Sequence, residues 1–573
     1  MKLIDNLKKK FIKKHRWYKY YTKEQRNIEV PKVSLYEYIR VHNLGNMNGI
    51  AINYFGRKIT YEEFFNSIDL CARSLVSHGV RPGDVVSVCM ANTPEAVIAF
   101  YAISKVGAIA NMIHPLSAEE EIKDSLNATM SVVLIAMNIC LDKIKNIIKD
   151  TKIYKTIVVS ASNYMPTLLS VGYYLMADRK VKVTKNNDVF VTWNDFINKG
   201  KKYNKDVYVD TGSDDPAVIM HSGGTSGTPK NIVLSNGNIN VVMEQAHIAL
   251  PELDRSDSML SILPLFHCFG LVETIHFPFA IGATVILVPK FDATRFDKLL
   301  NKYKPTVIPG VPTLFEAMIN NKHMQKIDFS KVKYVVSGGD SLDIKKNEIV
   351  NRFLREHGCH HNIIQGYGLT EAGGGIIFGA LGSDVLGSVG IPLPGNDLKI
   401  IDINTHEEVD CGVTGEIVVS APSIMMGYLN NEKETNEVLE KDKKGKIWLH
   451  TGDLGYINED GALFFVQRLK RLIIVSGYNV FPSHIEDVLN KNEYILNSCV
   501  VGIPDPYKIQ VPKAYIVLND GIKLTMEIKS EIKKYCKKNL SNYMIPKQFV
   551  FRESLPKTLI GKVDYKVLEK ENN

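Results

Sequence analysis

The fold is decided by the stretch His221-Ser-Gly-Gly-Thr-Ser-Gly-Thr-Pro-Lys230. It follows a short apolar run at 217–220, which is typical of a buried strand. Glycine allows the backbone to turn with its N–H groups exposed to a ligand. Serine and threonine add neutral donors, and Lys230 adds a positive charge. Such a loop can bind the phosphates of a nucleotide, and the alternative is a glycine-rich hairpin without a ligand.

The stretch is not a Walker A loop, because Thr228 and Pro229 separate Gly227 from Lys230. A P-loop NTPase is therefore disfavoured. The stretch resembles the Thr-Ser/Gly-Gly-Thr-Thr-Gly-x-Pro-Lys loop of the adenylate-forming superfamily, which includes acyl-CoA synthetases, luciferases and peptide-synthetase adenylation domains. The resemblance implies that the loop binds ATP, with Thr225 also counted as catalytic. The loop residues that it assigns to ATP are Ser222, Gly223, Gly224, Thr225, Ser226, Gly227 and Lys230.

Length and composition indicate a large soluble protein. A chain of 573 residues exceeds one hydrophobic core, so at least two domains are expected. Hydrophobic residues make up 45% and charged residues 23%, which is ordinary for a globular protein. The eight cysteines form no Cys-x-x-Cys pair, which indicates neither a zinc site nor a disulfide framework. A reducing, cytoplasmic compartment fits this pattern.

The net charge of +8 is concentrated at the start of the chain. Residues 1–26 hold ten Lys/Arg and two Asp/Glu, so the remainder is near neutral and no nucleic-acid partner is indicated. Residues 1–12 show helical apolar spacing, and an aromatic cluster follows at 17–21. Weak contact of residues 1–21 with an anionic membrane is one interpretation, and the favoured alternative is a leader docked on its own domain. No signal-peptide core follows the basic start, and no apolar run has membrane-spanning length.

Helix and strand patterns alternate over residues 33–150. The spacing predicts a helix over Tyr61–Ser77, a strand over Asp84–Met90 and a helix over Thr93–Val106, which indicates a parallel sheet with helices on its faces. The apolar piece Leu168–Leu175 is interpreted as a packed helix, with a place at a substrate entrance as the alternative. Residues 396–466 read as antiparallel strands that end in a hairpin around an Asp-Gly turn.

Two later motifs are similar to acyl-site segments of the superfamily. Leu263-Pro-Leu-Phe-His267-Cys-Phe-Gly270 resembles the aromatic-or-His motif beside the carboxylate, which implies a catalytic role for His267. Gly338 and Gly339 lie in a Ser-Gly-Gly-Asp-Ser-Leu run that also matches a carrier-protein attachment site and a hydrolase motif. Both alternatives are disfavoured because the run follows a strand in mid-domain. The resemblance places the two glycines against the nucleotide base and the acyl pocket.

The stretch 363–371 supplies groups that suit different parts of an adenylate. Tyr367 offers a flat face for adenine, Thr370 a hydroxyl for the α-phosphate, and Glu371 a carboxylate for Mg²⁺, which prefers oxygen ligands. The alternative, a helix cap with a core tyrosine, is disfavoured by the phosphate loop upstream. The resemblance assigns six residues of this stretch to the nucleotide, namely Gln365, Gly366, Tyr367, Gly368, Thr370 and Glu371.

The later motifs complete the resemblance. Asp453 follows Thr-Gly, and a carboxylate has two acceptor oxygens that suit the vicinal hydroxyls of a ribose. The resemblance makes Arg468 a ribose or phosphate ligand, Lys470 the hinge of a small rotating domain, and Lys562 the catalytic lysine. The segment that the resemblance assigns to CoA and thiolation comprises Ser476, Gly477 and Tyr478.

The order of motifs over roughly residues 35–565 identifies the chain as a member of the adenylate-forming superfamily. The resemblance implies an α/β fold with a large N-terminal domain of stacked sheets, flanking helices and a β-barrel-like subdomain, followed by a small mobile α+β domain. The expected division is a leader at 1–30, an adenylation domain at 31–468 and a mobile domain at 469–573.

The implied function is ATP-dependent activation of a carboxylic acid as acyl-AMP, followed by transfer to CoA. The thiolation segment resembles that of medium- and long-chain fatty-acyl-CoA synthetases, with aryl acids second. The implied cofactors are ATP, Mg²⁺ and coenzyme A. A stand-alone enzyme that loads a carrier protein, an oxidative luciferase-like enzyme and a non-catalytic nucleotide-binding protein stay open as alternatives.

Overall fold

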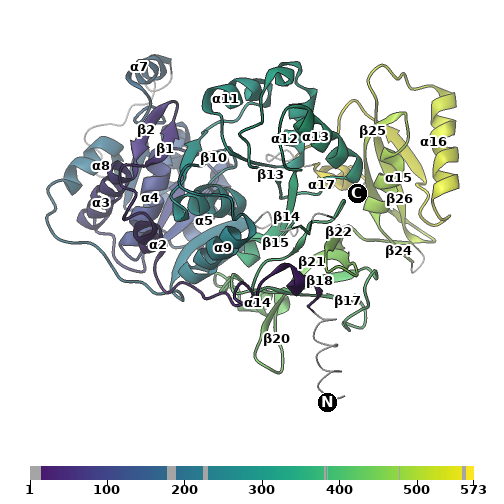
Figure 1. Ribbon diagram of the computed structural model, residues 1–573, viewed down its shortest axis with the longest axis horizontal. Helices are drawn as coiled ribbons and strands as arrows, with labels where there is room; N and C mark the ends of the chain where they lie inside the picture. Colours follow the sequence, from purple (N-terminus) through teal and green to yellow (C-terminus); the bar gives the residue numbers. More distant parts are fainter. Residues whose placement is uncertain are drawn as a thin grey trace. The chain divides into compact units, whose positions relative to one another are not determined.

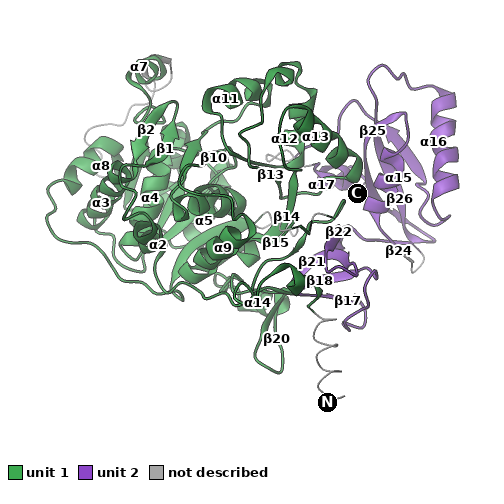
Figure 2. Ribbon diagram, in the orientation of Figure 1, with its two compact units in different colours: residues 1–397, 419–449 green, residues 398–418, 450–573 purple. Residues whose placement is uncertain are grey.

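The computed structural model describes residues 15–176, 189–222, 230–379, 382–383, 385–475, 478–557 and 563–572. They form two compact units (Figure 2). Unit 1 comprises residues within 1–397 and 419–449, and unit 2 comprises residues within 398–418 and 450–573. The expected hinge and domain boundary near residue 468 remains a prediction.

The first sheet of unit 1 has nine strands in the order β16-β15-β14-β13-β12-β10-β11-β1-β2. The strands from β14 to β1 pair in parallel, and antiparallel strands close both edges. In sheet order the strands span Ile391–Pro392, Gly374–Phe378, Ile364–Leu369, Tyr334–Ser337, Val307–Gly310, Ser258–Ser261, Thr284–Leu287, Ile50–Tyr54 and Arg57–Thr60.

The second sheet of unit 1 has eight strands in the order β19-β9-β8-β4-β3-β5-β6-β7. Its strands from β8 to β7 pair in parallel, and β9 and β19 extend one edge in antiparallel fashion. In sheet order the strands span Gly427–Tyr428, Lys230–Ser235, Pro216–Ser222, Ile109–Ile113, Val85–Cys89, Val133–Met137, Lys155–Val159 and Phe190–Thr192.

Two buried helices lie between the sheets of unit 1 (Figure 1). Every residue of α4 (Pro94–Lys105) is buried, and Thr93 caps its first turn by accepting a hydrogen bond from the Ala96 N–H. Helix α9 (Asn236–Ala249) contacts β9 of one sheet and β15 of the other. Helix α9 is less completely covered than α4, because His247 near its end is exposed.

The remaining helices of unit 1 cover the outer faces of the sheets or connect strands. The expected helix over Tyr61–Ser77 is confirmed as α3, which begins with a capping box between Thr60 and Glu63. The other α-helices are α2 (Leu35–His42), α5 (Glu119–Ala128), α6 (Leu141–Ile147), α7 (Thr167–Met176), α8 (Trp193–Gly200), α10 (Phe277–Ala280), α11 (Phe296–Tyr303), α12 (Pro312–Asn320), α13 (Ile344–Glu356) and α14 (Glu432–Val438). The single-turn and irregular helices are η1 (Arg16–Tyr20), η2 (Asn138–Cys140), η3 (Ile148–Asp150), η5 (Phe269–His276), η6 (Ala293–Arg295), η7 (Lys322–Lys326) and η8 (Thr370–Ala372).

The apolar piece at 168–175 is helical, as expected, and it is packed on one side only, where Tyr173 lies against the core of unit 1. Leu168 in α7 is 90% exposed. The apolar composition of the helix did not predict this exposure, because an apolar helix is normally covered by its own fold.

The aromatic cluster after the basic leader docks on unit 1. Trp17 and Tyr21 are buried, and the Tyr21 hydroxyl donates a hydrogen bond to the Pro392 carbonyl at 2.9 Å. This part of the leader matches the docked alternative. Residues 1–14 lie outside the described ranges.

The antiparallel strands expected over 396–466 are confirmed. A sheet runs in the order β17-β18-β21-β20, and β22 pairs with β21. The expected Asp-Gly turn joins β21 to β22, where Ile457 lies opposite Leu463. The strands span Asp397–Ile401, Gly415–Ser420, Ile447–Ile457, Leu439–Lys441 and, for β22, Leu463–Arg468.

The last hundred residues form an α+β arrangement with its own core. Five strands run in the order β24-β23-β26-β25, with β27 beside β26. The strands span Tyr478–Val480, Ile473–Val475, Ile509–Leu518, Ile495–Asp505 and, for β27, Gln548–Phe551. The helices are η9 (Leu469–Arg471), α15 (Pro482–Asn490), α16 (Met526–Asn539) and α17 (Tyr565–Lys570).

These observations confirm the α/β fold class, with large stacked sheets and a small α+β part. None of the eight cysteines, all within the described ranges, forms a disulfide. No helix in those ranges combines the length and apolar character of a bilayer span.

Candidate active site

The two ends of the phosphate loop are held together by an antiparallel strand pair. Ser222 ends β8 and lies opposite Lys230, which begins β9. One pair further back, the His221 ring Nδ1 lies 2.8 Å from the Asn231 amide oxygen. Strands β8 and β9 therefore form a hairpin, and Ser222 and Lys230 lie side by side in it. The superfamily usually has an aromatic residue and a glycine where His221 and Asn231 stand, and here the two departures bind each other.

A buried network of polar side chains contacts this hairpin through His221. The His221 Nε2 lies 2.7 Å from the Asn111 amide oxygen and 3.2 Å from the Ser125 hydroxyl. The Asn111 amide group in turn donates to the hydroxyls of Ser87 and Thr129. Burial lowers the pKa of His221 to about 4, so the ring is neutral near pH 7 and serves as a fixed hydrogen-bonding strut.

Lys230 contacts two protein side chains. Its Nζ lies 2.7 Å from the Glu434 carboxylate and 4.3 Å from the centre of the Tyr428 ring. Tyr428 belongs to β19, which pairs directly with β9. Glu434, on α14, is about one-third exposed, so this ion pair is weak and a phosphate group can replace the carboxylate.

Glu371 lies beside the same tyrosine. The Tyr428 hydroxyl donates to Glu371 Oε1 at 3.1 Å, and the Met425 N–H donates to the Glu371 carbonyl at 2.9 Å. Burial and the Glu371 carboxylate raise the pKa of Tyr428, which keeps its proton on the hydroxyl as a donor. The structure thus brings Lys230 and Glu371 to one tyrosine.

The other nucleotide candidates of unit 1 lie at the carboxyl ends of neighbouring parallel strands. Ser337 at the end of β13 lies opposite Gln365 of β14, and the Gly338 N–H donates to the carbonyl of Gly310 at the end of β12. Ligands of open α/β sheets bind at this edge. Gly339 has φ of 78°, a left-handed conformation that favours glycine.

Gly368 is required by a close approach of two backbones. A Cβ atom there would lie 2.1 Å from the Gly374 carbonyl oxygen of the neighbouring strand. The preceding residue, Tyr367, is buried, and Thr370 begins η8 directly after the strand. Gly366 is less constrained, because a Cβ there would lie 3.1 Å from the Phe378 ring and 3.7 Å from the Ile377 carbonyl oxygen.

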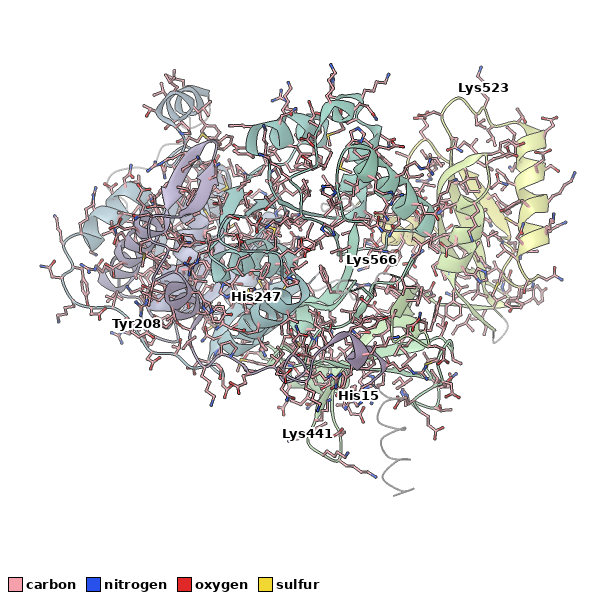
Figure 3. The ribbon with its side chains drawn as sticks, viewed as in Figure 1. His15, Tyr208, His247, Lys441, Lys523 and Lys566 are labelled. Atoms are coloured by element: carbon pink, nitrogen blue, oxygen red, sulfur yellow. The ribbon has the colours of Figure 1, made fainter. Side chains whose placement is uncertain are left out.

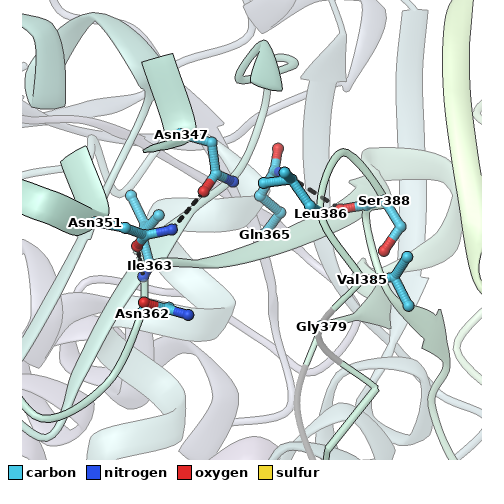
Figure 4. Close-up of a pocket in the computed structure, with 9 residues that line it drawn as sticks. All are labelled: Asn347, Asn351, Asn362, Ile363, Gln365, Gly379, Val385, Leu386 and Ser388. Carbon is cyan, nitrogen blue, oxygen red and sulfur yellow. Dashed lines mark hydrogen bonds between the residues drawn. The ribbon is translucent and has the colours of Figure 1, made fainter. Parts of the chain in front are cut away.

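Gln365 lines a cavity of about 120 Å³ (Figure 4). Its amide donates to the Ser388 carbonyl at 3.2 Å, and its oxygen accepts from the Leu342 N–H at 3.4 Å. Asn347 and Asn351 of α13 line the same cavity and are hydrogen-bonded to each other. The Gln365 side chain is therefore a strut between two loops, and the contact with a base that the resemblance implies remains a prediction.

His267 precedes η5, a π-helix of the kind that often occurs at functional sites. The next residue but one, Phe269, lies against the Gly338 loop, since a Cβ on that glycine would be 2.9 Å from its ring. The carboxyls of Glu273 and Glu371, after burial, contribute to the raised pKa of the Cys268 thiol. The segment after His267 thus lies near the Gly338 loop and Glu371, and the catalytic role of His267 that the resemblance implies remains a prediction.

Glu273 in η5 is a feature that motif reading missed. Its Oε1 accepts a hydrogen bond from the Gly375 N–H at 2.6 Å, directly after η8. Its Oε2 is buried and has no hydrogen-bond partner among the described residues. Burial raises the pKa of Glu273 to about 8, so the group is mostly protonated at pH 7. The only available signal was an acidic residue within an apolar helical run.

Asp453 and Arg468 are brought together within unit 2. They are opposite each other in β21 and β22, and the Arg468 Nε lies 3.5 Å from Asp453 Oδ1. The Asp453 side chain is 7% exposed and that of Arg468 54% exposed. Lys470 follows in η9 and is exposed.

Several predicted site residues cannot be located. Tyr478 begins β24, but its side chain lies outside the description. The others outside the described ranges are Gly223, Gly224, Thr225, Ser226, Gly227, Ser476, Gly477 and Lys562.

Comparison with known proteins agrees with this geometry. A profile of the AMP-binding enzyme family matches residues 40–429, and one of the AMP-binding enzyme C-terminal domain matches residues 484–562. A long-chain-fatty-acid–CoA ligase of Bacillus subtilis is 31% identical over 90% of both chains. A probable 4-coumarate–CoA ligase of Dictyostelium discoideum is 30% identical over 96% of this chain and 98% of its own.

The fold is also that of solved structures. The crystal structure of the anthranilate CoA ligase AuaEII in complex with anthranoyl-AMP superposes with a TM-score of 0.81, at 23% identity, over 95% of this chain and 98% of that chain. The family match spans more than half of the chain. The chain therefore belongs to the AMP-binding enzyme family, the adenylate-forming ligases.

Proposed function

We propose that the protein converts a medium- or long-chain fatty acid to its CoA thioester in two steps, with acyl-AMP as the intermediate. The main support for the proposal is that Lys230 and Glu371 both contact Tyr428. Gly338 and Tyr367 belong to the ends of the neighbouring strands β13 and β14. A cation, a carboxylate and an aromatic ring are groups that a nucleoside triphosphate requires.

In the first step an oxygen of the acid attacks the α-phosphorus of ATP, and the bond from that phosphorus to the pyrophosphate oxygen breaks. Negative charge spreads over the phosphoryl oxygens, so fixed donors and cations supply most of the catalysis. Lys230 leaves Glu434 to hold the β/γ phosphates together with the loop at 222–230, and Lys562 bridges the acid and the α-phosphate.

The donor set fits a magnesium ion that is bound mainly by the nucleotide. Glu371 Oε1 accepts from Tyr428, and no hydrogen bond to Oε2 occurs among the described residues. Those residues contain no cluster of three or more His, Cys, Asp or Glu able to hold a metal. Mg²⁺ commonly takes one or two carboxylates with substrate phosphates, and when bound it neutralises phosphate charge. Glu371 would hold it.

In the second step the thiol of CoA attacks the acyl carbonyl carbon, and AMP leaves with the carboxyl oxygen that it acquired. The small C-terminal part rotates about Lys470, so that Lys562 withdraws and residues 476–478 approach the thiol. Asp453 holds the ribose hydroxyls through both steps, with Arg468 beside it.

The fatty-acid assignment is supported by the Bacillus subtilis ligase and by the resemblance of the segment at 475–482, while the 4-coumarate ligase of similar identity keeps aryl acids in view. Release of AMP with CoA should be measured over octanoate, dodecanoate, hexadecanoate, 4-coumarate, benzoate and anthranilate. The highest kcat/KM is expected with dodecanoate or hexadecanoate. Preference for an aryl acid would reject the substrate class, and faster transfer to a phosphopantetheinylated carrier protein would reject CoA as the acceptor.

A further inference from the structure

Helix α7 presents apolar side chains to solvent. Its sequence, Thr167-Leu-Leu-Ser-Val-Gly-Tyr-Tyr-Leu-Met176, contains no charged residue. Four aliphatic side chains within eight residues are exposed, by 90% for Leu168, 49% for Leu169, 54% for Val171 and 59% for Leu175. A contiguous apolar surface of this kind marks an interaction site, because scattered single residues would not cluster on one helix.

Helix α7 is anchored to unit 1 by the residues that precede it and by Tyr173. Met165 just before it is buried, and Tyr173 packs with its partly buried ring against the core of unit 1. The Tyr54 hydroxyl of β1 donates to the Ala161 carbonyl at 3.0 Å, which fixes the segment leading into α7. A Cβ atom on Gly172 would meet nothing within 4 Å, and several side chains on α7 extend away from the rest of unit 1 in the view of Figure 3.

Three cationic residues lie in or beside the turn between β1 and β2, and one of them contacts the segment that leads into α7. The Arg57 guanidinium lies 4.9 Å from the centre of the Tyr164 ring, just before the helix. Exposed Lys58 follows it in β2, and the Lys302 Nζ donates to the Phe55 carbonyl in the turn between β1 and β2. Arg57, Lys58 and Lys302 form no ion pair with a carboxylate in the part of the chain that the structure describes.

We propose that α7 docks the protein on a lipid bilayer that carries anionic head groups. The four aliphatic side chains enter the boundary between head groups and acyl chains, and Arg57, Lys58 and Lys302 contact the phosphates. An uncharged helix with a cationic border is complementary to such a surface in both respects. A second copy of the chain suits this face less well, because docking through it would bring two cationic borders together.

Membrane contact is assigned here to α7 and not to the basic leader. Trp17 and Tyr21, the aromatic residues that an N-terminal membrane anchor would use, are buried in unit 1. It also goes beyond the proposed reaction, because the affinity for a bilayer depends on exposed side chains of α7 and not on the acid that is activated.

The test is co-sedimentation of the full-length protein with vesicles of phosphatidylcholine and 30% phosphatidylglycerol. The variant L168Q/L175Q changes only exposed side chains and should keep the melting temperature of the wild type. Its vesicle affinity should fall at least tenfold. The matched control L524Q/M526Q removes two other exposed apolar side chains, in unit 2, and should bind as the wild type does.

Two further variants separate the contributions of charge. K58Q/K302Q should weaken binding to anionic vesicles severalfold, with little effect on pure phosphatidylcholine vesicles. K8Q/K9Q/K10Q tests the basic leader and should weaken binding less than L168Q/L175Q does. The proposal is overturned if the wild type does not sediment, or if L168Q/L175Q binds like the wild type. It is also overturned if light scattering shows a dimer that L168Q/L175Q dissociates.

Discussion

Replacement of Glu273 by glutamine should change how the stability of unit 1 depends on pH. The side chain is fully buried in η5, and burial raises its pKa from 4.5 to about 8. The folded protein therefore keeps a proton on this carboxyl at pH values where the unfolded chain has lost it. Stability contributed by such a group is present below the unfolded pKa and is lost as the pH rises towards the folded pKa.

The magnitude follows from the two pKa values. Between pH 5.5 and pH 8 the unfolding free energy of the wild type should fall by about 3 kcal/mol because of Glu273 alone, with one pKa unit equal to about 1.4 kcal/mol. Glutamine keeps an oxygen for the Gly375 N–H and cannot ionise. The Glu273→Gln variant should therefore lack this part of the decline and should be the more stable protein at pH 8.

The assay is urea unfolding of wild type and Glu273→Gln at half-unit steps from pH 5.5 to pH 8. Only the difference between the two curves counts, because Glu95, whose pKa burial raises to about 7, contributes a decline of the same sign to both. Glu437→Gln, at an exposed position of α14, is the matched control and should follow the wild type. Parallel curves for wild type and Glu273→Gln would refute the reasoning.

Three predictions concern the reaction. Lys562→Ala should abolish formation of acyl-AMP and spare thioester formation from supplied acyl-AMP, as measured by separate half-reaction assays, and equal loss of both would contradict its role. Lys470→Pro should slow the second half-reaction more than the first, because proline restricts the hinge φ, and an unchanged thioester rate would contradict the hinge. Glu434→Gln should lower the KM for ATP by about two- to fivefold with kcat unchanged, because an ion pair of this exposure is worth about 1 kcal/mol or less. An unaltered KM would show that Lys230 does not have to leave Glu434.

Helices and strands with strong local signals could be predicted from the sequence. The helix over Tyr61–Ser77 agrees at both ends, because a capping box and a regular apolar stripe mark it. One of the antiparallel strands expected over 396–466 is Ile447–Ile457, which continues through Asp453. Within this strand Gly452 has a left-handed φ of 66°, and pairing with β22 begins at Asp453, opposite Arg468.

Contacts between distant segments could not be predicted. Lys230 meets Glu434 because β19 pairs with β9, and no local pattern encodes a pairing across two hundred residues. The exposure of Leu168 depends likewise on what the rest of the fold leaves uncovered. The motifs themselves, from the loop at 221–230 to Glu371, could be predicted because each is short and carries its chemistry in its own sequence.

The central claim is that this chain makes an acyl-adenylate and passes the acyl group to CoA. The most direct measurement is product analysis by mass spectrometry after incubation of the full-length protein with ATP, Mg²⁺, CoA and hexadecanoate. Hexadecanoyl-CoA, AMP and pyrophosphate should form in equal amounts, and no AMP should form when the acid is omitted. Formation of ADP and phosphate, or AMP release that does not depend on any carboxylic acid, would contradict it.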